Sequence, residues 1–103
     1  MTDGGIKINV TIKLFGSIRY AVGVSEADIE FPSGGTVYQL LRFFADTYGK
    51  ELEGELFLPD GTGLREDLTV IVNGTITERS KVLTTKIDDG ANVALLPVFP
   101  GGG

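Results

Sequence analysis

The stretch Asp88-Asp89-Gly90-Ala91-Asn92-Val93-Ala94-Leu95-Leu96-Pro97 decides how the rest of the chain is arranged. Its first three residues are typical of a turn, and residues 91–96 are apolar at nearly every position. A strand with so few polar side chains is usually covered on both faces, which predicts a central place in a sheet. Pro97 ends the strand because proline has no N–H group to donate to a neighbouring strand.

A second strong strand is expected near the amino terminus. Apolar side chains occupy every other position there, in the order Ile6, Ile8, Val10, Ile12 and Leu14. This period of two is typical of a strand with one buried face. Residues 17–23 fit either a loop or a single helical turn, and a weaker strand is expected over residues 27–31. The two strands are expected to form a hairpin with a loop longer than the tight types.

One main helix is expected to follow Thr36. Thr36 and Gln39 have the spacing of a capping box, and Gly49 is a suitable residue just after the last turn. The apolar side chains between them recur at helical spacing as Val37, Leu40, Leu41, Phe44 and Tyr48. We interpret this stripe as part of the core, because such stripes usually pack against a sheet.

The segment between the helix and the last strand is less regular. Residues 51–57 could form a short turn of helix, and residues 59–63 are typical of a loop. Leu68–Val72 is a strand of buried type, and Asn73-Gly74 fits a tight type I′ hairpin turn. A brief return strand is expected over residues 75–77, followed by a loop or short strand over residues 81–87.

This order of elements predicts an α+β fold of the β-grasp type, with a mixed sheet of four to five strands and the main helix packed across one face. The first and last strands would lie side by side at its centre. A ferredoxin-like split βαβ fold is the alternative. It needs a second helix of comparable quality, which residues 50–67 do not offer. We expect residues 1–97 to form one domain and residues 98–103 a flexible tail.

Composition excludes several classes of function. The chain of 103 residues contains no Cys and no His, which excludes a thiol nucleophile, a Ser–His triad and the usual zinc sites. A net charge of −5 disfavours a nucleic-acid partner. No apolar run approaches a membrane span and no signal peptide is evident, so a cytoplasmic location without membrane partners is expected by default. We expect no catalytic residue, no metal and no permanently bound cofactor.

The chain ends in Val98-Phe99-Pro100-Gly101-Gly102-Gly103. Glycines form the thinnest backbone and tolerate conformations that are closed to other residues. From Pro97 to Gly103 the extended chain would reach at most roughly 23–25 Å, at about 3.3–3.6 Å per residue. Such a tail could enter a narrow channel of another protein with its carboxylate at the tip. The alternative interpretation is a frayed end without function.

These pieces together resemble a known family, the ubiquitin-like sulfur carriers. The family includes the small subunit of molybdopterin synthase and the thiamine-biosynthesis carrier, and the archaeal small modifier proteins share its shape. The resemblance rests on the hairpin Val70-Ile71-Val72-Asn73-Gly74, on residues 88–97 and on the terminal Gly102-Gly103. The chain departs from the family pattern in a tail that is one residue longer, in the bulky Phe99, and in Asn92, which replaces the usual acid.

The resemblance implies a carrier rather than an enzyme. An E1-like activating enzyme would use ATP to adenylate the carboxyl group of Gly103, and sulfur would then replace the adenylate to give a thiocarboxylate. The acceptor would be similar to the large subunit of molybdopterin synthase. Alternatively, lysines of target proteins would attack the activated Gly103, which would make the chain a covalent modifier. A third alternative is a non-covalent ubiquitin-like interaction domain.

The same resemblance suggests where a partner would bind. Gly101 and Gly102 would lie in the partner's channel together with Gly103. Exposed parts of Leu96, Val98, Phe99 and Phe15 would form an apolar patch at the root of the tail, of the kind that marks interfaces. For Leu96 and Phe15, a place in the core is an equally good interpretation. The free protein is expected to be a monomer.

Overall fold

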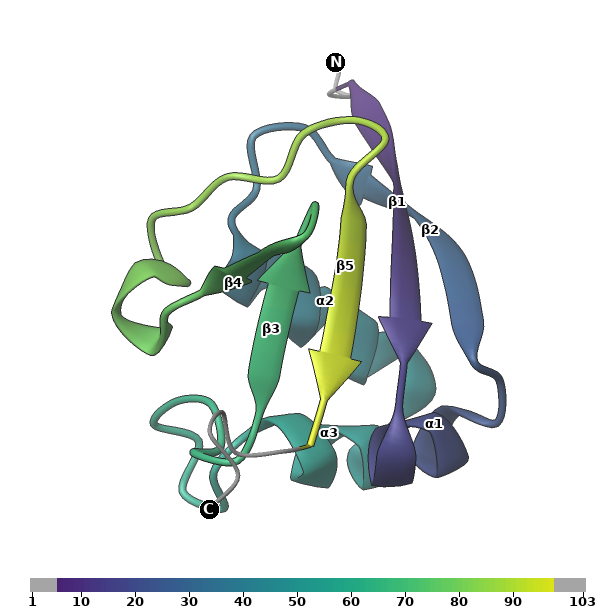
Figure 1. The fold of residues 1–103 in the computed structure, drawn as a ribbon, viewed down its shortest axis with the longest axis vertical. Helices are drawn as coiled ribbons and strands as arrows, with labels where there is room; N and C mark the ends of the chain where they lie inside the picture. Colours follow the sequence, from purple (N-terminus) through teal and green to yellow (C-terminus); the bar gives the residue numbers. More distant parts are fainter. Residues whose placement is uncertain (1–5, 98–103) are drawn as a thin grey trace.

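The computed structural model describes residues 6–97 and contains one five-stranded sheet in the order β2-β1-β5-β3-β4 (Figure 1). The strands are β1 Lys7–Leu14, β2 Glu26–Pro32, β3 Thr69–Val72, β4 Thr75–Thr77 and β5 Asn92–Leu96. β1 and β5 run parallel, whereas the other neighbours are antiparallel. The prediction of a β-grasp fold is therefore confirmed, with the first and last strands side by side and β5 at the centre.

The main helix, α2 Val37–Tyr48, crosses one face of the sheet, behind the strands in Figure 1. The predicted capping box is present at its start. The N–H of Gln39 donates to Oγ1 of Thr36 over 3.3 Å, and the N–H of Thr36 donates to Oε1 of Gln39 over 2.9 Å. Gly49 ends the helix at a φ of +101°. Tyr48 is the exception in the predicted stripe, because it is 40% exposed.

Two shorter helices cover the edge of the sheet where β1 and β5 end (Figure 1). α1 Gly16–Val22 is a seven-residue helix where the sequence suggested a loop or a single turn. It buries Ile18, and its Ser17 hydroxyl donates to Oε1 of Glu55 in α3 over 2.6 Å. α3 Lys50–Leu56 confirms the short helix expected in this segment. None of the helices in the described part of the chain combines the length and the apolar character that a membrane crossing requires.

The core lies between α2 and the inner face of the sheet. The side chains of α2 that reach it are Val37, Leu40, Leu41, Phe44 and Ala45. They meet the inward-facing residues Ile8, Val10, Ile12, Leu14, Val70, Val93 and Leu95. Burial of each such aliphatic side chain stabilises the fold by about 1.5–3 kcal/mol before entropy is counted. The predicted apolar alternation of β1 therefore serves this single core from Ile8 to Leu14. Ile6, the first residue of the predicted alternation, precedes the strand and is 78% exposed.

Candidate functional site

The turn before β5 fixes the position at which the chain later leaves the sheet. The backbone N–H of Asn9 donates to Oδ1 of Asp89 over 2.8 Å, and the N–H of Gly90 donates to the carbonyl of Asn9 over 2.8 Å. Gly90 adopts a φ of +80°, which favours glycine. These bonds tie the turn to β1. A shift of one residue would place the side chains of β5 on the opposite face of the sheet. The bonds between this turn and β1 therefore fix the register of β5 and, with it, the place where the chain leaves the sheet at Pro97.

The Asn73-Gly74 turn holds β5 from the other side. Asn73 and Gly74 have φ values of +51° and +85°, as a type I′ turn requires. The N–H of Asn92 donates to Oδ1 of Asn73 over 2.9 Å, and the N–H of Asn73 donates to the carbonyl of Asn92 over 2.8 Å. Both bonds use the backbone of Asn92, whose side chain is exposed. The family's usual acid at this position is therefore not needed for the turn.

The root of the tail is packed against the start of α1. The N–H of Phe15 donates to the carbonyl of Leu95 over 3.2 Å, which extends the contact between β1 and β5. Gly16 follows at a φ of +58°, and a Cβ atom on it would lie only 2.7 Å from Cγ of Pro97. Both the backbone conformation and the contact with Pro97 thus require glycine at this position.

An apolar surface lies on the outer face of the sheet beside this root. Ala94 of β5 lies opposite Ile71 of β3, which in turn lies opposite Ile76 of β4. Leu96 shares their face because side chains alternate along a strand. Phe15 is placed beside Leu96 by its bond to Leu95. We name these five residues the apolar patch.

The exposure of the apolar patch is substantial. Ile76 is 56% exposed and Phe15 is 44% exposed, whereas Ile71, Ala94 and Leu96 are half-buried. A contiguous exposed apolar surface of this kind marks an interaction site more often than isolated apolar residues do. The patch offers a docking surface directly at the point where the chain leaves the sheet.

The sequence anticipated part of this site. Phe15 and Leu96 lie together in the apolar patch, and neither is fully buried. The other predicted site residues, Val98, Phe99, Gly101, Gly102 and Gly103, lie outside the described residues. Sequence reasoning missed Ile71, Ile76, Ala94 and Gly16. Alternation around the predicted hairpin could have placed Ile71 and Ile76 on one face, but their position beside β5 depends on the register between distant strands.

The acidic groups with shifted pKa values have local partners. Among the described residues, no three Asp, Glu, His or Cys side chains are grouped so as to hold a metal ion. Two carboxyl groups in the loop between α3 and β3 have shifted pKa values. The hydrogen bond from Arg65 lowers the pKa of Asp67, and the hydroxyl and backbone N–H of Thr62 lower the pKa of Asp60. Each of these acids already has a local partner, so both stabilise the loop.

Comparisons with known proteins give one family match and several solved structures of similar fold. The model of the ThiS family matches residues 12–102. The HVO 2177 protein of Haloferax volcanii is 25% identical, with a TM-score of 0.78 over 99% of this chain and 93% of its own. A putative molybdopterin converting factor, subunit 1, from Pyrococcus furiosus is 28% identical, with a TM-score of 0.70 over 88% of this chain and 98% of its own.

A third solved structure extends the likeness in shape. The small archaeal modifier protein 1 of H. volcanii is 23% identical, with a TM-score of 0.77 over 88% of this chain and 98% of its own. At that identity the likeness concerns the fold alone. A comparison with curated proteins finds no match. The family match over residues 12–102, together with the fold, shows that the chain belongs to the ThiS family of ubiquitin-like sulfur carriers and modifiers.

Proposed function

We propose that this chain is a sulfur carrier whose Gly103 carboxylate is adenylated by an E1-like enzyme and then converted to a thiocarboxylate. The observation that carries the proposal is that the family match extends to residue 102 and so includes Gly101 and Gly102, directly before the terminal Gly103. The central strand β5 ends directly before that tail, and the apolar patch lies beside its root. A rigid mount, a docking surface and a thin reactive end are the parts that a carrier needs.

The chemistry of the tail follows from the weakness of a carboxylate as an electrophile. In the first step a Gly103 carboxylate oxygen attacks the α-phosphorus of ATP, and pyrophosphate leaves. In the second step a hydrosulfide attacks the acyl carbon, and AMP leaves with the bonding electron pair. The product is a thiocarboxylate, which is a nucleophilic sulfur donor. ATP belongs to the activating enzyme, and the chain contributes the acyl group.

The role of the apolar patch in this scheme is to bind the activating enzyme and the sulfur acceptor. Partners that bury such a patch gain about 25 cal/mol per Å² of apolar surface removed from water. The tail would enter the partner's active site next to this interface, with Val98 and Phe99 adding to the contact. The likeness to the putative molybdopterin converting factor subunit supports an acceptor similar to the large subunit of molybdopterin synthase.

Adenylation is the step to test first. The cognate activating enzyme should catalyse exchange of labelled pyrophosphate into ATP in the presence of the wild-type chain. Deletion of Gly102 and Gly103 should abolish this exchange, because the remaining carboxyl group would no longer reach the nucleotide. Leu83→Ser is a suitable control, since Leu83 is 64% exposed in the loop before β5. Exchange at the full rate with the deletion variant would overturn the proposal.

Covalent modification of other proteins is the alternative outcome at the same acyl group. A lysine amine would attack the adenylate, AMP would leave, and an isopeptide bond would form. The last basic residue of the chain is Lys86. Trypsin would therefore leave a branch on the target lysine that begins at Ile87, and mass spectrometry of cell proteins would detect it. Such branches without any thiocarboxylate would favour the modifier over the carrier.

A further inference from the structure

The edge strand β2 leaves part of its backbone without hydrogen-bond partners. Two hydrogen bonds at the ends of the pairing between β2 and β1 show which residues of β2 bond to β1. The N–H of Leu14 donates to the carbonyl of Ser25 over 2.9 Å, and the N–H of Ser33 donates to the carbonyl of Ile6 over 2.8 Å. In an antiparallel pair the bonded residues alternate with residues that point away. The odd-numbered residues of β2 therefore bond to β1.

The backbone N–H and carbonyl groups of the even-numbered residues of β2 consequently point away from β1, toward solvent at the edge of the sheet. These residues are Glu26, Asp28 and Glu30, and no other described residue hydrogen-bonds to their N–H and carbonyl groups. The row ends at Pro32, which has no N–H and whose carbonyl accepts from Gly35 over 3.4 Å. The N–H and carbonyl groups of these three alternate residues are thus available to a further strand.

The same three residues carry carboxylates on the outer face. Across the ladder, Glu26 lies opposite Lys13 and Glu30 lies opposite Asn9. Asp28 accepts a hydrogen bond from Oγ1 of Thr11 over 2.7 Å. We name Glu26, Asp28 and Glu30 the acidic edge. Charges on an edge strand oppose pairing with a second copy, since like charges on adjacent strands repel each other. A strand with basic side chains would instead be attracted.

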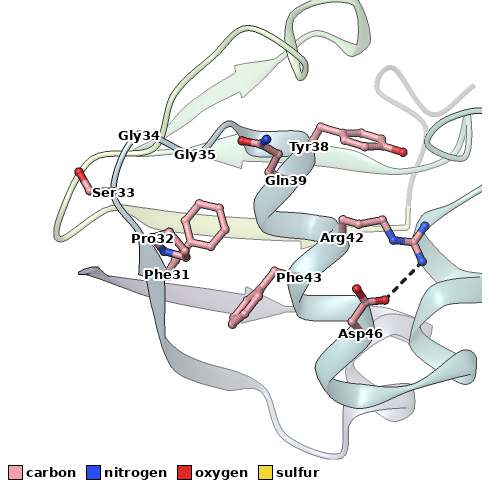
Figure 2. Close-up of a pocket in the computed structure, with 10 residues that line it drawn as sticks. All are labelled: Phe31, Pro32, Ser33, Gly34, Gly35, Tyr38, Gln39, Arg42, Phe43 and Asp46. Atoms are coloured by element: carbon pink, nitrogen blue, oxygen red, sulfur yellow. Dashed lines mark ion pairs between the residues drawn. The ribbon is translucent and has the colours of Figure 1, made fainter. Parts of the chain in front are cut away.

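The inner side of this edge is a groove between β2 and α2, shown in Figure 2. It has a volume of about 510 Å³. Phe31 and Phe43 form its apolar wall, with ring centroids 5.7 Å apart. Phe43 is 40% exposed, so part of this wall is open to solvent. Gly35 leaves room for the Phe31 ring, because a Cβ atom on Gly35 would overlap that ring.

The only described cation in the groove lining, Arg42, is already engaged. Its guanidinium lies 3.6 Å from Oδ1 of Asp46 and bonds to Glu53 of α3. It also lies 4.4 Å from the centre of the Phe57 ring. Figure 2 shows this side chain extending sideways from α2, on the side away from Phe31. The groove therefore presents apolar side chains beside the acidic edge, and Arg42 does not neutralise that edge.

We propose that β2 binds an extended segment of another protein as an added strand, and that this segment alternates apolar and basic residues. Its backbone would bond to the N–H and carbonyl groups of the acidic edge. Side chains on one face of the segment would enter the groove beside Phe31 and Phe43. Those on the other face would lie next to the carboxylates of Glu26, Asp28 and Glu30. Strand addition of this kind combines backbone affinity with side-chain specificity. This surface differs from the apolar patch and does not require chemistry at Gly103.

The test is a titration of the full chain with the blocked peptide Lys-Val-Lys-Ile-Lys-Val-Lys, followed by NMR. We expect amide shifts in β2 and around Phe43, and slower hydrogen exchange at Glu26, Asp28 and Glu30. A peptide with Glu in place of every Lys should bind at least tenfold more weakly. Equal binding of the two peptides, shifts centred on the apolar patch, or self-association through β2 would each overturn the proposal.

Two matched comparisons sharpen the test. The pair Glu26→Lys and Glu30→Lys should weaken binding of the lysine peptide at least tenfold. The pair Glu66→Lys and Glu78→Lys changes the net charge equally at exposed positions away from β2 and should leave binding unchanged. N-methylation of the peptide residues whose N–H groups face β2 should abolish binding, whereas N-methylation of the residues between them should preserve it. Equal effects of the two pairs of substitutions, or of the two sets of N-methylated peptides, would contradict strand addition.

Discussion

The outer face of the sheet has two unlike halves that meet at β5. On one side of Ala94 lies Lys13 of β1, with the acidic edge beyond it on β2. On the other side lie Ile71 and Ile76, which continue the apolar patch. The described chain ends at Pro97, directly after Leu96 of the apolar patch. The difference indicates two kinds of contact: burial of a large apolar surface near the reactive end, and charge-selected strand pairing at the far edge.

The largest expected effect is the loss of activation when the apolar half is made charged. Leu96→Asp should lower the adenylation rate at a limiting concentration of chain about a hundredfold, which corresponds to about 2.7 kcal/mol of lost binding. The reason is that an unpaired carboxylate would be desolvated at the root of the tail. Pyrophosphate exchange measures the rate, and Leu96→Met should retain it.

The same measurement on the acidic half provides the matched control. Glu30→Lys changes an exposed charge on the opposite half of the outer face and should leave the exchange rate within about twofold of the wild type, as expected for a residue outside the interface. An equal loss from Leu96→Asp and Glu30→Lys would show that the two halves do not have separate roles.

A smaller effect is expected at the root of the tail. Gly16→Ala should destabilise the fold by about 2 kcal/mol, because its Cβ would press on Pro97 and its positive φ disfavours alanine. Gly23→Ala is the control, since Gly23 has a φ of +96° but no atom within 4 Å of the added Cβ. It should cost about 1 kcal/mol from the backbone alone. Urea denaturation measures both, and equal losses would rule out a specific role for the Pro97 contact.

The hairpin on the apolar half allows a further test of how β5 is held. Asn73→Gly keeps the positive φ but removes the Oδ1 atom that accepts from the N–H of Asn92. The free energy of unfolding should fall by about 1 kcal/mol, the usual contribution of one such bond. Hydrogen exchange at the backbone N–H of Asn92 should also become faster than in the wild type. An unchanged stability would show that backbone pairing alone fixes the register of β5.

The smallest effect concerns the ion pair that precedes β3. Nε of Arg65 lies 3.1 Å from Oδ1 of Asp67 in a partly exposed pair. Asp67→Asn should cost less than about 1 kcal/mol at neutral pH. Because the pKa of Asp67 is lowered in the folded state, its contribution is present above the ordinary value of 3.8 and is lost as the pH falls through the folded value. The difference between the two proteins should therefore shrink in acid, and urea denaturation at several pH values measures it.

Local patterns were sufficient for most of the fold. The alternation of β1, the capping box at Thr36 and the apolar run before Pro97 each depend on neighbours in sequence, and the structure confirms them. Helix α1 was not evident, because its N-cap Phe15 makes no side-chain hydrogen bond and a glycine begins its first turn. Its stability comes from Ile18 in the core, which is a tertiary effect.

The candidate site was harder to predict for the same reason. Phe15 and Leu96 could be named from their place near the tail, but the apolar patch joins β5 to residues about twenty positions earlier in the chain. The sequence predicted that the first and last strands are neighbours, but it did not predict the pairing of β5 with β3 or its register. The acidic edge could likewise not be identified as a binding surface before β2 was known to be an outer strand with unpaired backbone groups.

A thiocarboxylate at Gly103 can be detected in the intact mass of the chain, purified from its own cells under conditions that preserve thiocarboxylates. We expect a population that is heavier by the replacement of one oxygen with one sulfur, located by fragmentation to Gly103. That population should be absent from the variant that lacks Gly102 and Gly103. A single unmodified mass in cells that contain the active cognate enzyme, or a sulfur atom located elsewhere in the chain, would contradict it.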